Sequence, residues 1–170
     1  MEGRLIAAVR VIPDAVKRAR WRNTLVYRFL PTLTAGIEMN FLSEEEKVNP
    51  LANWLAVKET RVRPALIFGT SSDRIGTPTG QSFYGTLSKD LKPHTQIPIA
   101  PYAGVAFGTY EDKWRPIGGV NIRFPKNFSS LIIYDGVKVH PTASWSYRNF
   151  TFMFLLAFAK HPGLGASASF

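Results

Sequence analysis

The sequence predicts an all-β fold, an antiparallel up-and-down β-barrel of about ten strands, with a range of roughly eight to twelve. Apolar and polar residues alternate at every second position along most of the 170 residues, which is the period of a strand whose two faces differ. Clusters of Gly, Pro, Asp and Asn separate the alternating stretches, as turns do. A run of about 18 apolar residues, which a membrane-spanning helix would need, does not occur. The length suits one domain, which we take to cover residues 1–170.

The first half of the chain is divided into alternating stretches by loops of different composition. The first stretch ends at Pro13 and is followed by a basic connection, residues 15–22, which could equally form a short surface helix. The second stretch is the longest, and Pro31 within it predicts a bulge, because proline cannot donate to a strand ladder. The expected strands of this half cover residues 4–12, 24–41, 54–69 and 82–89.

The second half contains more closely spaced stretches. Gly104 and Gly108 lie on one side of the first of them, which indicates tight curvature or close packing inside a barrel. Asp135-Gly136 is the strongest two-residue hairpin signal in the chain. An even number of strands would place both ends of the chain on the same side of the barrel. The expected strands of this half cover residues 97–110, 114–124, 130–134, 137–147, 150–158 and 163–170.

The last two stretches carry the most specific pattern. Phenylalanine or leucine occupies every second position over residues 150–158, and the final stretch alternates again and ends on Phe170. This pattern resembles the C-terminal strand of bacterial outer-membrane β-barrels, although Ala166 and Ala168 stand where that family usually has larger residues. The resemblance implies a transmembrane barrel in a bacterial outer membrane, contact with outer-membrane lipid, and recognition of the C-terminal strand by the barrel-assembly machinery.

A further resemblance involves the Asp135-Gly136 hairpin, the strand after it and the closing pair of strands. This end of the chain is similar to the barrel proteins encoded with bacterial exopolysaccharide export systems. The similarity is one of pattern rather than of a motif. It implies a role in moving or anchoring surface polysaccharide.

The chain is strongly basic, with a net charge of +9 and a pI of about 10.0. Apart from a cluster in residues 17–22, the basic residues are scattered, and many occupy alternate strand positions. This distribution favours charge in a barrel interior and in loops over a nucleic-acid-binding surface, so we expect no nucleic-acid partner. Residues 1–20 lack the small-residue cleavage site of a secretion signal, so no signal peptide is visible in this sequence.

Alternation is also expected for a soluble lipocalin-like barrel, which has its apolar face inside. The polar faces of this chain hold Arg, Ser, Thr, Asn and Gly rather than many Lys and Glu, which favours the lumen of a membrane barrel. Aromatic residues also lie toward strand ends, as in the aromatic girdles of membrane barrels. A soluble barrel that binds an apolar ligand stays the alternative. The aromatic residues expected at the membrane interface are Trp54, Tyr110, Trp114, Trp145, Tyr147 and Phe170.

The charged residues of the expected lumen support two hypotheses. Arginine outnumbers acid there, so the interior could select or bind an anionic solute or polysaccharide. The hypothesis that we favour is that long side chains nearly fill the lumen, with Glu38 and Glu59 pairing with neighbouring arginines. In both cases we expect a structural or transport role, porin-like or polysaccharide-related. The residues assigned to the lumen are Arg28, Glu38, Glu59, Arg61, Arg63, Arg115, Arg123, Lys138, His140 and Arg148, with Arg10 on the same face.

His140 is the candidate for acid–base chemistry, and a lipid-modifying barrel enzyme is the third hypothesis. No Gly-x-Ser-x-Gly motif accompanies it, and Ser144 and Ser146 fit the pattern of ordinary strand serines. His94, His140 and His161 lack metal-ligand spacing, and the chain contains no cysteine. We therefore expect no catalytic residue, no metal and no cofactor.

Overall fold

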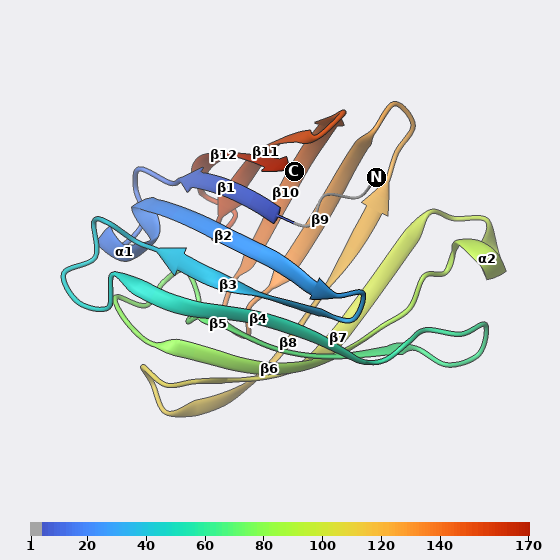
Figure 1. Cartoon of the computed structure of the whole chain (residues 1–170), viewed down its shortest axis with the longest axis horizontal. Helices are drawn as coiled ribbons and strands as arrows, with labels where there is room; N and C mark the ends of the chain where they lie inside the picture. Colours follow the sequence, from blue (N-terminus) through green and yellow to red (C-terminus); the bar gives the residue numbers. More distant parts are fainter. Residues whose placement is uncertain (1–4) are drawn as a thin grey trace.

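The computed structural model describes residues 5–170, in which the chain runs up and down around a closed β-barrel (Figure 1). Consecutive strands pair antiparallel, and the last strand pairs with the first. The predicted all-β, up-and-down barrel is therefore confirmed. The strands are β1 (Leu5–Val11), β2 (Trp21–Leu30), β3 (Leu33–Met39), β4 (Val48–Val57), β5 (Ala65–Ser72), β6 (Gln81–Ser88), β7 (Ile99–Gly108), β8 (Lys113–Arg123), β9 (Phe128–Tyr134), β10 (Val139–Tyr147), β11 (Phe150–Ala157) and β12 (His161–Ser169).

Short helices occur in two of the connections, α1 (Lys17–Arg20) and α2 (Lys92–Thr95). Within residues 5–170, no helix is long and apolar enough to cross a membrane.

The barrel has twelve strands in the described residues rather than about ten, and twelve is the upper limit of the expected range of eight to twelve. Two stretches that were expected to be single strands are hairpins, which accounts for the difference. In the stretch 24–41, Pro31 and Thr32 form the turn between β2 and β3, because the fixed φ of proline and its missing N–H suit a turn better than a ladder position. In the stretch 54–69, residues 58–64 connect β4 to β5. Arg4, expected to begin the first strand, lies outside the described residues.

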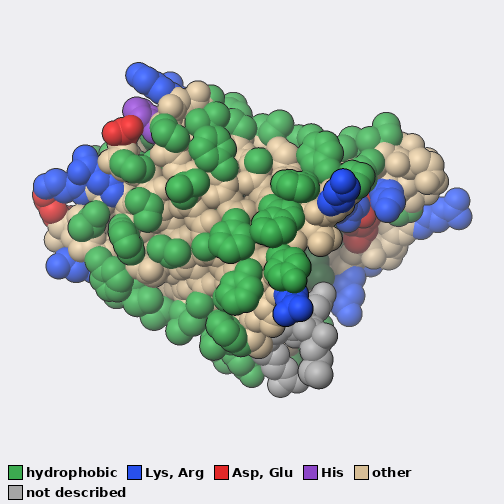
Figure 2. Space-filling view, turned by 90° about the horizontal axis from the view of Figure 1, so that it is seen from above, with side chains coloured by type: hydrophobic (Ala, Val, Ile, Leu, Met, Phe, Trp, Pro, Cys, Tyr) green, Lys and Arg blue, Asp and Glu red, His purple; other side chains and the backbone are tan. Residues whose placement is uncertain are grey.

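The outer and inner faces of the barrel wall differ in chemistry, as the alternation predicts. On the outer face, Trp145 of β10 lies opposite Phe152 of β11 and Phe128 of β9, with ring centroids 6.1 and 6.5 Å away. Phe152 is 51% exposed, whereas Glu38 on the inner face is fully buried. Figure 2 shows hydrophobic side chains spread over the body of the barrel and most charged side chains toward its two ends. Other exposed apolar residues of the strands include Leu25, Tyr27, Ile37, Trp54, Phe68, Phe83, Val105, Trp114, Ile132, Phe154 and Leu164.

The two ends of the barrel carry different connections. β1 begins and β12 ends at one end, where backbone hydrogen bonds of 3.2 and 2.8 Å join Leu5 and Phe170. We call this the terminal end, and α2 lies there (Figure 1). The opposite end carries α1, and we call it the α1 end. Leu5 and Phe170 thus lie together, as an even number of strands requires.

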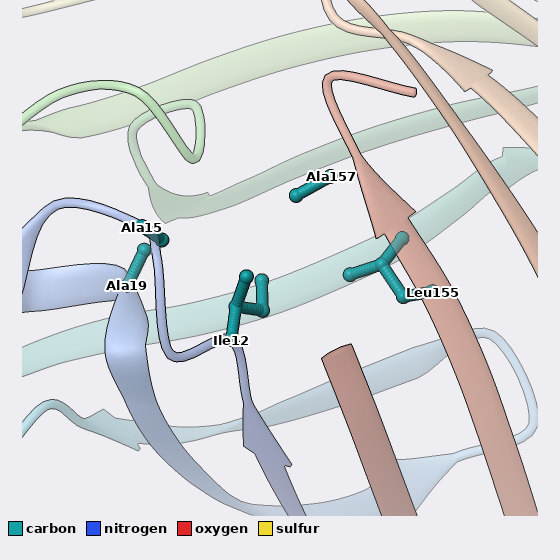
Figure 3. Packing of buried hydrophobic residues seen from close by; sticks show 5 residues of the cluster. All are labelled: Ile12, Ala15, Ala19, Leu155 and Ala157. Carbon is teal, nitrogen blue, oxygen red and sulfur yellow. The ribbon is translucent and has the colours of Figure 1, made fainter. Parts of the chain in front are cut away.

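The connection between β1 and β2 packs against the barrel wall at the α1 end and forms a small apolar core. Ile12 is fully buried there, which stabilises the fold by about 1.5–3 kcal/mol relative to exposure. Gly163 of β12 makes room for it, because a Cβ at that position would lie 2.8 Å from Ile12 Cγ1. This core fixes the connection across the end of the lumen. Its members are Ile12, Ala15, Ala19, Leu155 and Ala157 (Figure 3).

Candidate functional site

Half of the charged residues that the sequence assigned to the lumen lie on the inner face of a strand. Glu38 of β3 and His140 of β10 are buried inside the barrel. Arg28 lies on the inner face of β2, opposite Thr34. Arg115 and Arg123 lie at opposite ends of the inner face of β8.

The other assigned residues lie in connections. Glu59, Arg61 and Arg63 belong to the exposed β4–β5 connection at the terminal end, rather than to the wall of the lumen. Lys138 lies in the exposed β9–β10 turn, and Arg148 lies in the β10–β11 turn, where its guanidinium is 5.3 Å from the centre of the Tyr147 ring. Their assignment to the lumen was wrong because the alternation of the sequence continues through residues that leave the strands.

Three arginines converge on one carboxylate inside the barrel near the α1 end, and we call this set the arginine cluster. Arg10 of β1 and Arg22 of β2 lie directly opposite each other in register. Arg18 of α1 reaches inward and is 3% exposed. The carboxylate is that of Glu38, which forms an ion pair with Arg22 and lies 3.9 Å from Arg18 Nη1.

Hydrogen bonds hold Glu38 and Arg18 in place. Glu38 Oε1 accepts hydrogen bonds from Asn40 Nδ2 at 2.9 Å and from the Ser72 hydroxyl. Arg18 donates to the carbonyl oxygens of Thr77 and Asp73, both at 2.9 Å, and of Arg74 at 2.7 Å, so α1 is tied to the β5–β6 loop. Burial lowers the pKa of the Arg18 guanidinium from its ordinary value, although Glu38 acts in the opposite direction.

The sequence missed Arg18 and Arg22 because both fall in the basic connection that was expected at the surface. The signal for Arg22 was present: Arg22, Thr24, Val26 and Arg28 occupy every second position and share the inner face of β2. No sequence pattern marks Arg18, since its burial depends on how the connection folds back over the barrel.

Two cavities adjoin the arginine cluster. One has a volume of about 230 Å³, lies toward the α1 end and is bordered by Arg10, Arg18, Arg22, His140 and Thr142. The other has a volume of about 300 Å³ and is bordered by Arg10 and Arg22. Its remaining polar lining consists of the side chains of Thr24, Ser144, Thr151 and Ser167.

The carboxylate of Glu111 is paired with two arginines, Arg115 and Arg74. Glu111 accepts hydrogen bonds from Arg115 Nη2 and from Arg74 Nη2, both at 2.8 Å. The hydrogen bonds from Arg115 and then Arg74 lower the pKa of Glu111 from its ordinary value. These residues border a cavity of about 170 Å³ together with Tyr84 and Tyr102. This part of the lumen fits the hypothesis that long side chains nearly fill the interior, with acidic residues paired with neighbouring arginines.

Tyr84 and Tyr102 lie against glycines of the neighbouring strands. Tyr84 is opposite Gly69 in register, and a Cβ on that glycine would lie 2.5 Å from the tyrosine ring. Tyr102 is opposite Gly119, where a Cβ would lie 2.6 Å from the ring. Because these glycines have no side chain, both rings can lie close to the backbone of the inner wall. The tyrosines therefore occupy the lumen without bulging the wall.

His140 is held between two hydrogen bonds. Its Nδ1 accepts the backbone N–H of Phe158 at 3.1 Å, so Nε2 carries the hydrogen that Asp135 Oδ2 accepts at 2.8 Å. Asp135 Oδ1 accepts the N–H groups of Val137 and Lys138. Burial alone would raise the pKa of Asp135, but the hydrogen bonds from His140 and from Lys138 and Val137 outweigh it and lower the pKa. His140 thus joins the β9–β10 and β11–β12 turns.

The aromatic residues expected at a membrane interface lie on the outer face or in turns, toward both ends. Trp54, Tyr147 and Phe170 lie toward the terminal end, and Trp145 lies one outward position further into β10 than Tyr147. Tyr110 and Trp114 lie at the α1 end. Trp114 is 69% exposed.

Across residues 5–170, no group of three or more His, Asp or Glu side chains is arranged to hold a metal ion. Comparisons with models of known protein families, with curated protein sequences and with solved structures find no significant match. The function is therefore argued from the barrel and its lumen.

Proposed function

We propose that this protein is a transmembrane β-barrel of a bacterial outer membrane with a structural or transport role. One observation carries the proposal: large apolar side chains project outward from most strands, while the buried inner face holds charged and hydroxyl side chains. A barrel in water would gain little from this arrangement, because its apolar groups would stay hydrated. In a bilayer the same groups contact lipid chains.

The lengths of the strands also support a barrel that spans a membrane. A tilted strand needs about 9–11 residues to cross the hydrocarbon core of a bilayer. β2, β4, β7, β8, β10 and β12 have 9 to 11 residues, and the other strands have 7 or 8. Aromatic residues lie toward both ends of the barrel, at the levels where the two membrane–water interfaces would be.

The alternative, a soluble lipocalin-like barrel, requires an apolar cavity for its ligand. The cavities described above are bordered by Arg, Glu, Asp, His, Ser and Thr side chains, which would leave polar groups facing an apolar ligand. The chemistry of the lumen therefore supports the membrane barrel over the alternative.

The lumen supports a role with anionic or polar solutes rather than a wide pore. Arg18 and the apolar core around Ile12 fix the β1–β2 connection across one end, and the cavities beneath it have volumes of about 170–300 Å³. We propose that solute passage, porin-like or related to surface polysaccharide, requires this connection to move. A non-enzymatic role is consistent with His140, whose two ring nitrogens both have hydrogen-bond partners in the protein.

The proposed partners follow from the outer face and from the closing strand. Outer-membrane lipid would cover the apolar side chains. The barrel-assembly machinery would bind β12, whose alternating residues pair with β1 to complete the barrel. Arg10, Arg22 and Arg115 lie on the inner face, and Figure 2 shows most charged side chains of the visible face toward the two ends, so we propose no nucleic-acid partner.

Refolding into lipid tests this proposal. The chain is diluted from urea into phosphatidylcholine vesicles or into plain buffer, and heated and unheated samples are compared on a gel. We expect a folded band that appears only with lipid and whose migration changes on heating. A monodisperse, β-rich protein in plain buffer would contradict the proposal.

A matched pair of variants distinguishes the two kinds of barrel. Val105 and Ala106 are neighbours on β7 that face outward and inward, respectively. Val105→Asn should lower the folded fraction in vesicles, and Ala106→Asn should change it little. The soluble alternative predicts the reverse order, because its apolar face would be the inner one.

A further inference from the structure

We propose that the lumen contains a binding site for a small oxyanion between Arg10 and Arg22, which would take inorganic phosphate or the phosphate or carboxylate group of a larger solute. The site is defined by the inner face of the barrel, so the inference does not depend on whether the outer face contacts lipid.

The arginine cluster has an excess of positive charge. Arg10 and Arg22 are directly opposite in register, a position in which like charges repel. Among the described residues, the carboxylate that forms ion pairs with the cluster is that of Glu38, and its pairs are with Arg22 and Arg18. Three guanidinium groups thus share one carboxylate. The side chains of Arg18 and Glu38 are buried and that of Arg22 is 24% exposed, so salt screens the cluster only in part.

The other acidic groups near the cluster have partners elsewhere. Asp73 accepts the backbone N–H groups of Arg74 and Tyr110, and Asp135 accepts a hydrogen bond from His140. Glu46 accepts the N–H of Gly80. Asp73 and Asp135 border the smaller cavity together with the arginines, whereas no acidic side chain of residues 5–170 borders the larger one, which is therefore the better place for an anion.

Hydrogen-bond donors in the cluster are left unused. The guanidinium of Arg10 forms no hydrogen bond or ion pair with any residue from 5 to 170. The Nε atoms of Arg10 and Arg22 are both shielded from solvent without an acceptor. A buried donor without an acceptor costs about 1–3 kcal/mol, and more when it is charged, so an acceptor with several oxygens would be stabilised here.

The cavities provide room for such an acceptor. Both adjoin Arg10 and Arg22, with volumes of about 230 and 300 Å³. The hydroxyl groups of Thr24 and Ser144 border the larger one and could donate to further oxygens of an anion. A small oxyanion and a few water molecules, each with a share of about 30 Å³ in the liquid, fit this space.

Phosphate binding to the folded barrel tests the inference. Inorganic phosphate is titrated into the folded full-length protein by calorimetry at constant ionic strength, with chloride as the comparison anion. We expect saturable binding of phosphate and none of chloride. Arg10→Gln should weaken phosphate binding at least tenfold.

The matched control is Arg115→Gln, which removes an inner-face arginine that Glu111 already neutralises. It should change phosphate affinity less than twofold. Equal weakening by both substitutions would mean that phosphate responds only to the overall charge, and would overturn the inference, as would the absence of phosphate binding to the unmodified protein.

A stability measurement covers the case in which a variant folds poorly. Bound anion raises the free energy of unfolding by mass action, so phosphate should raise the unfolding temperature of the unmodified protein and of Arg115→Gln but not of Arg10→Gln. Without phosphate, Arg10→Gln should be as stable as the unmodified protein or more so, because the repulsion with Arg22 is relieved. A clear loss of stability without phosphate would contradict the inference.

Discussion

At the scale of single residues, the contact between Asp135 and His140 has the most clearly defined chemistry. The imidazole is 2% exposed and connects two turns, and the carboxylate also accepts two backbone N–H groups of its own turn. The hydrogen bonds favour the ionised carboxylate more than burial disfavours it. The ionised form of Asp135 therefore stabilises the α1 end of the barrel.

This contact predicts a pH-dependent effect of Asp135→Asn. Because the pKa of Asp135 is lower in the folded state than in the unfolded state, its stabilisation is full above the unfolded value of about 3.9 and is lost as the pH falls through the folded value. We expect the substitution to lower the free energy of unfolding by about 1–3 kcal/mol at pH 7, measured in denaturant. The exposed control Asp112→Asn should change it little. A cost of Asp135→Asn that is the same at pH 7 and below the folded pKa would contradict this account.

The sequence predicted which face of its strand His140 occupies but not its partners. Alternation over residues 137–147 placed the side chain on the polar face, which is a local property. Asp135 was interpreted as a turn residue because Asp-Gly is a hairpin signal. A hairpin signal does not predict the hydrogen bond between Asp135 and His140, five residues further along the chain. Phe158, which provides the other hydrogen bond, comes from a turn that is adjacent only in the folded barrel.

At the scale of elements, the β1–β2 connection depends on Arg18. The hydrogen bonds of this side chain with Asp73, Arg74 and Thr77 join two loops that are more than fifty residues apart in sequence. The apolar core around Ile12 holds the same connection from the side of β11. Removing Arg18 should therefore loosen both loops without unfolding the barrel.

Hydrogen exchange measures this loosening. Arg18→Ala should destabilise the closed arrangement by about 1.5–3 kcal/mol, since hydrogen bonds from a charged donor are lost. Amides of residues 12–20 and 73–80 should then exchange about 10- to 150-fold faster, with β7 and β8 unchanged. Lys17→Ala, on the exposed side of α1, is the matched control and should leave the rates unchanged. Equal acceleration in both variants would mean that Arg18 does not hold the connection.

Elements were predictable from the sequence wherever alternation was continuous. The inner and outer residues of β7, β8, β10 and β11 follow the expected faces. The errors arose at Pro31 and at residues 58–64, because two strands whose alternation stays in phase across their connection look like one long strand. The helical geometry of α1 was left open, and its inward arginine depends on tertiary contacts that alternation does not describe.

At the scale of the whole molecule, the closed barrel separates an apolar exterior from a polar lumen. Within residues 5–170, closure leaves no unpaired strand edge, because β12 pairs with β1. Barrel closure was predictable from the number of alternating stretches, whereas the environment of the exterior was not, since alternation alone is common to soluble and membrane barrels.

A charged residue on the outer face should lower the free energy of unfolding, and by more the closer it lies to the middle of the bilayer. Phe154→Arg introduces a cation on the outer face near the middle of β11 and should lower the free energy of unfolding from vesicles by about 2–4 kcal/mol. Trp114→Arg, close to the α1 end, should cost about 0–1 kcal/mol. The free energies are measured by unfolding from vesicles in guanidinium. Similar small costs at the two positions would show that position 154 is in contact with water.

The central claim is that the outer face contacts lipid, and fluorescence quenching of Trp145 tests it most directly. A variant that keeps only this one of the four tryptophans is refolded into vesicles with bromine on the acyl chains or with ordinary chains. Trp145 packs with Phe128 and Phe152 on the outer face. If that face contacts lipid, the brominated chains should quench Trp145 strongly and acrylamide in water should quench it little. Efficient quenching by acrylamide with no effect of the brominated chains would contradict the claim.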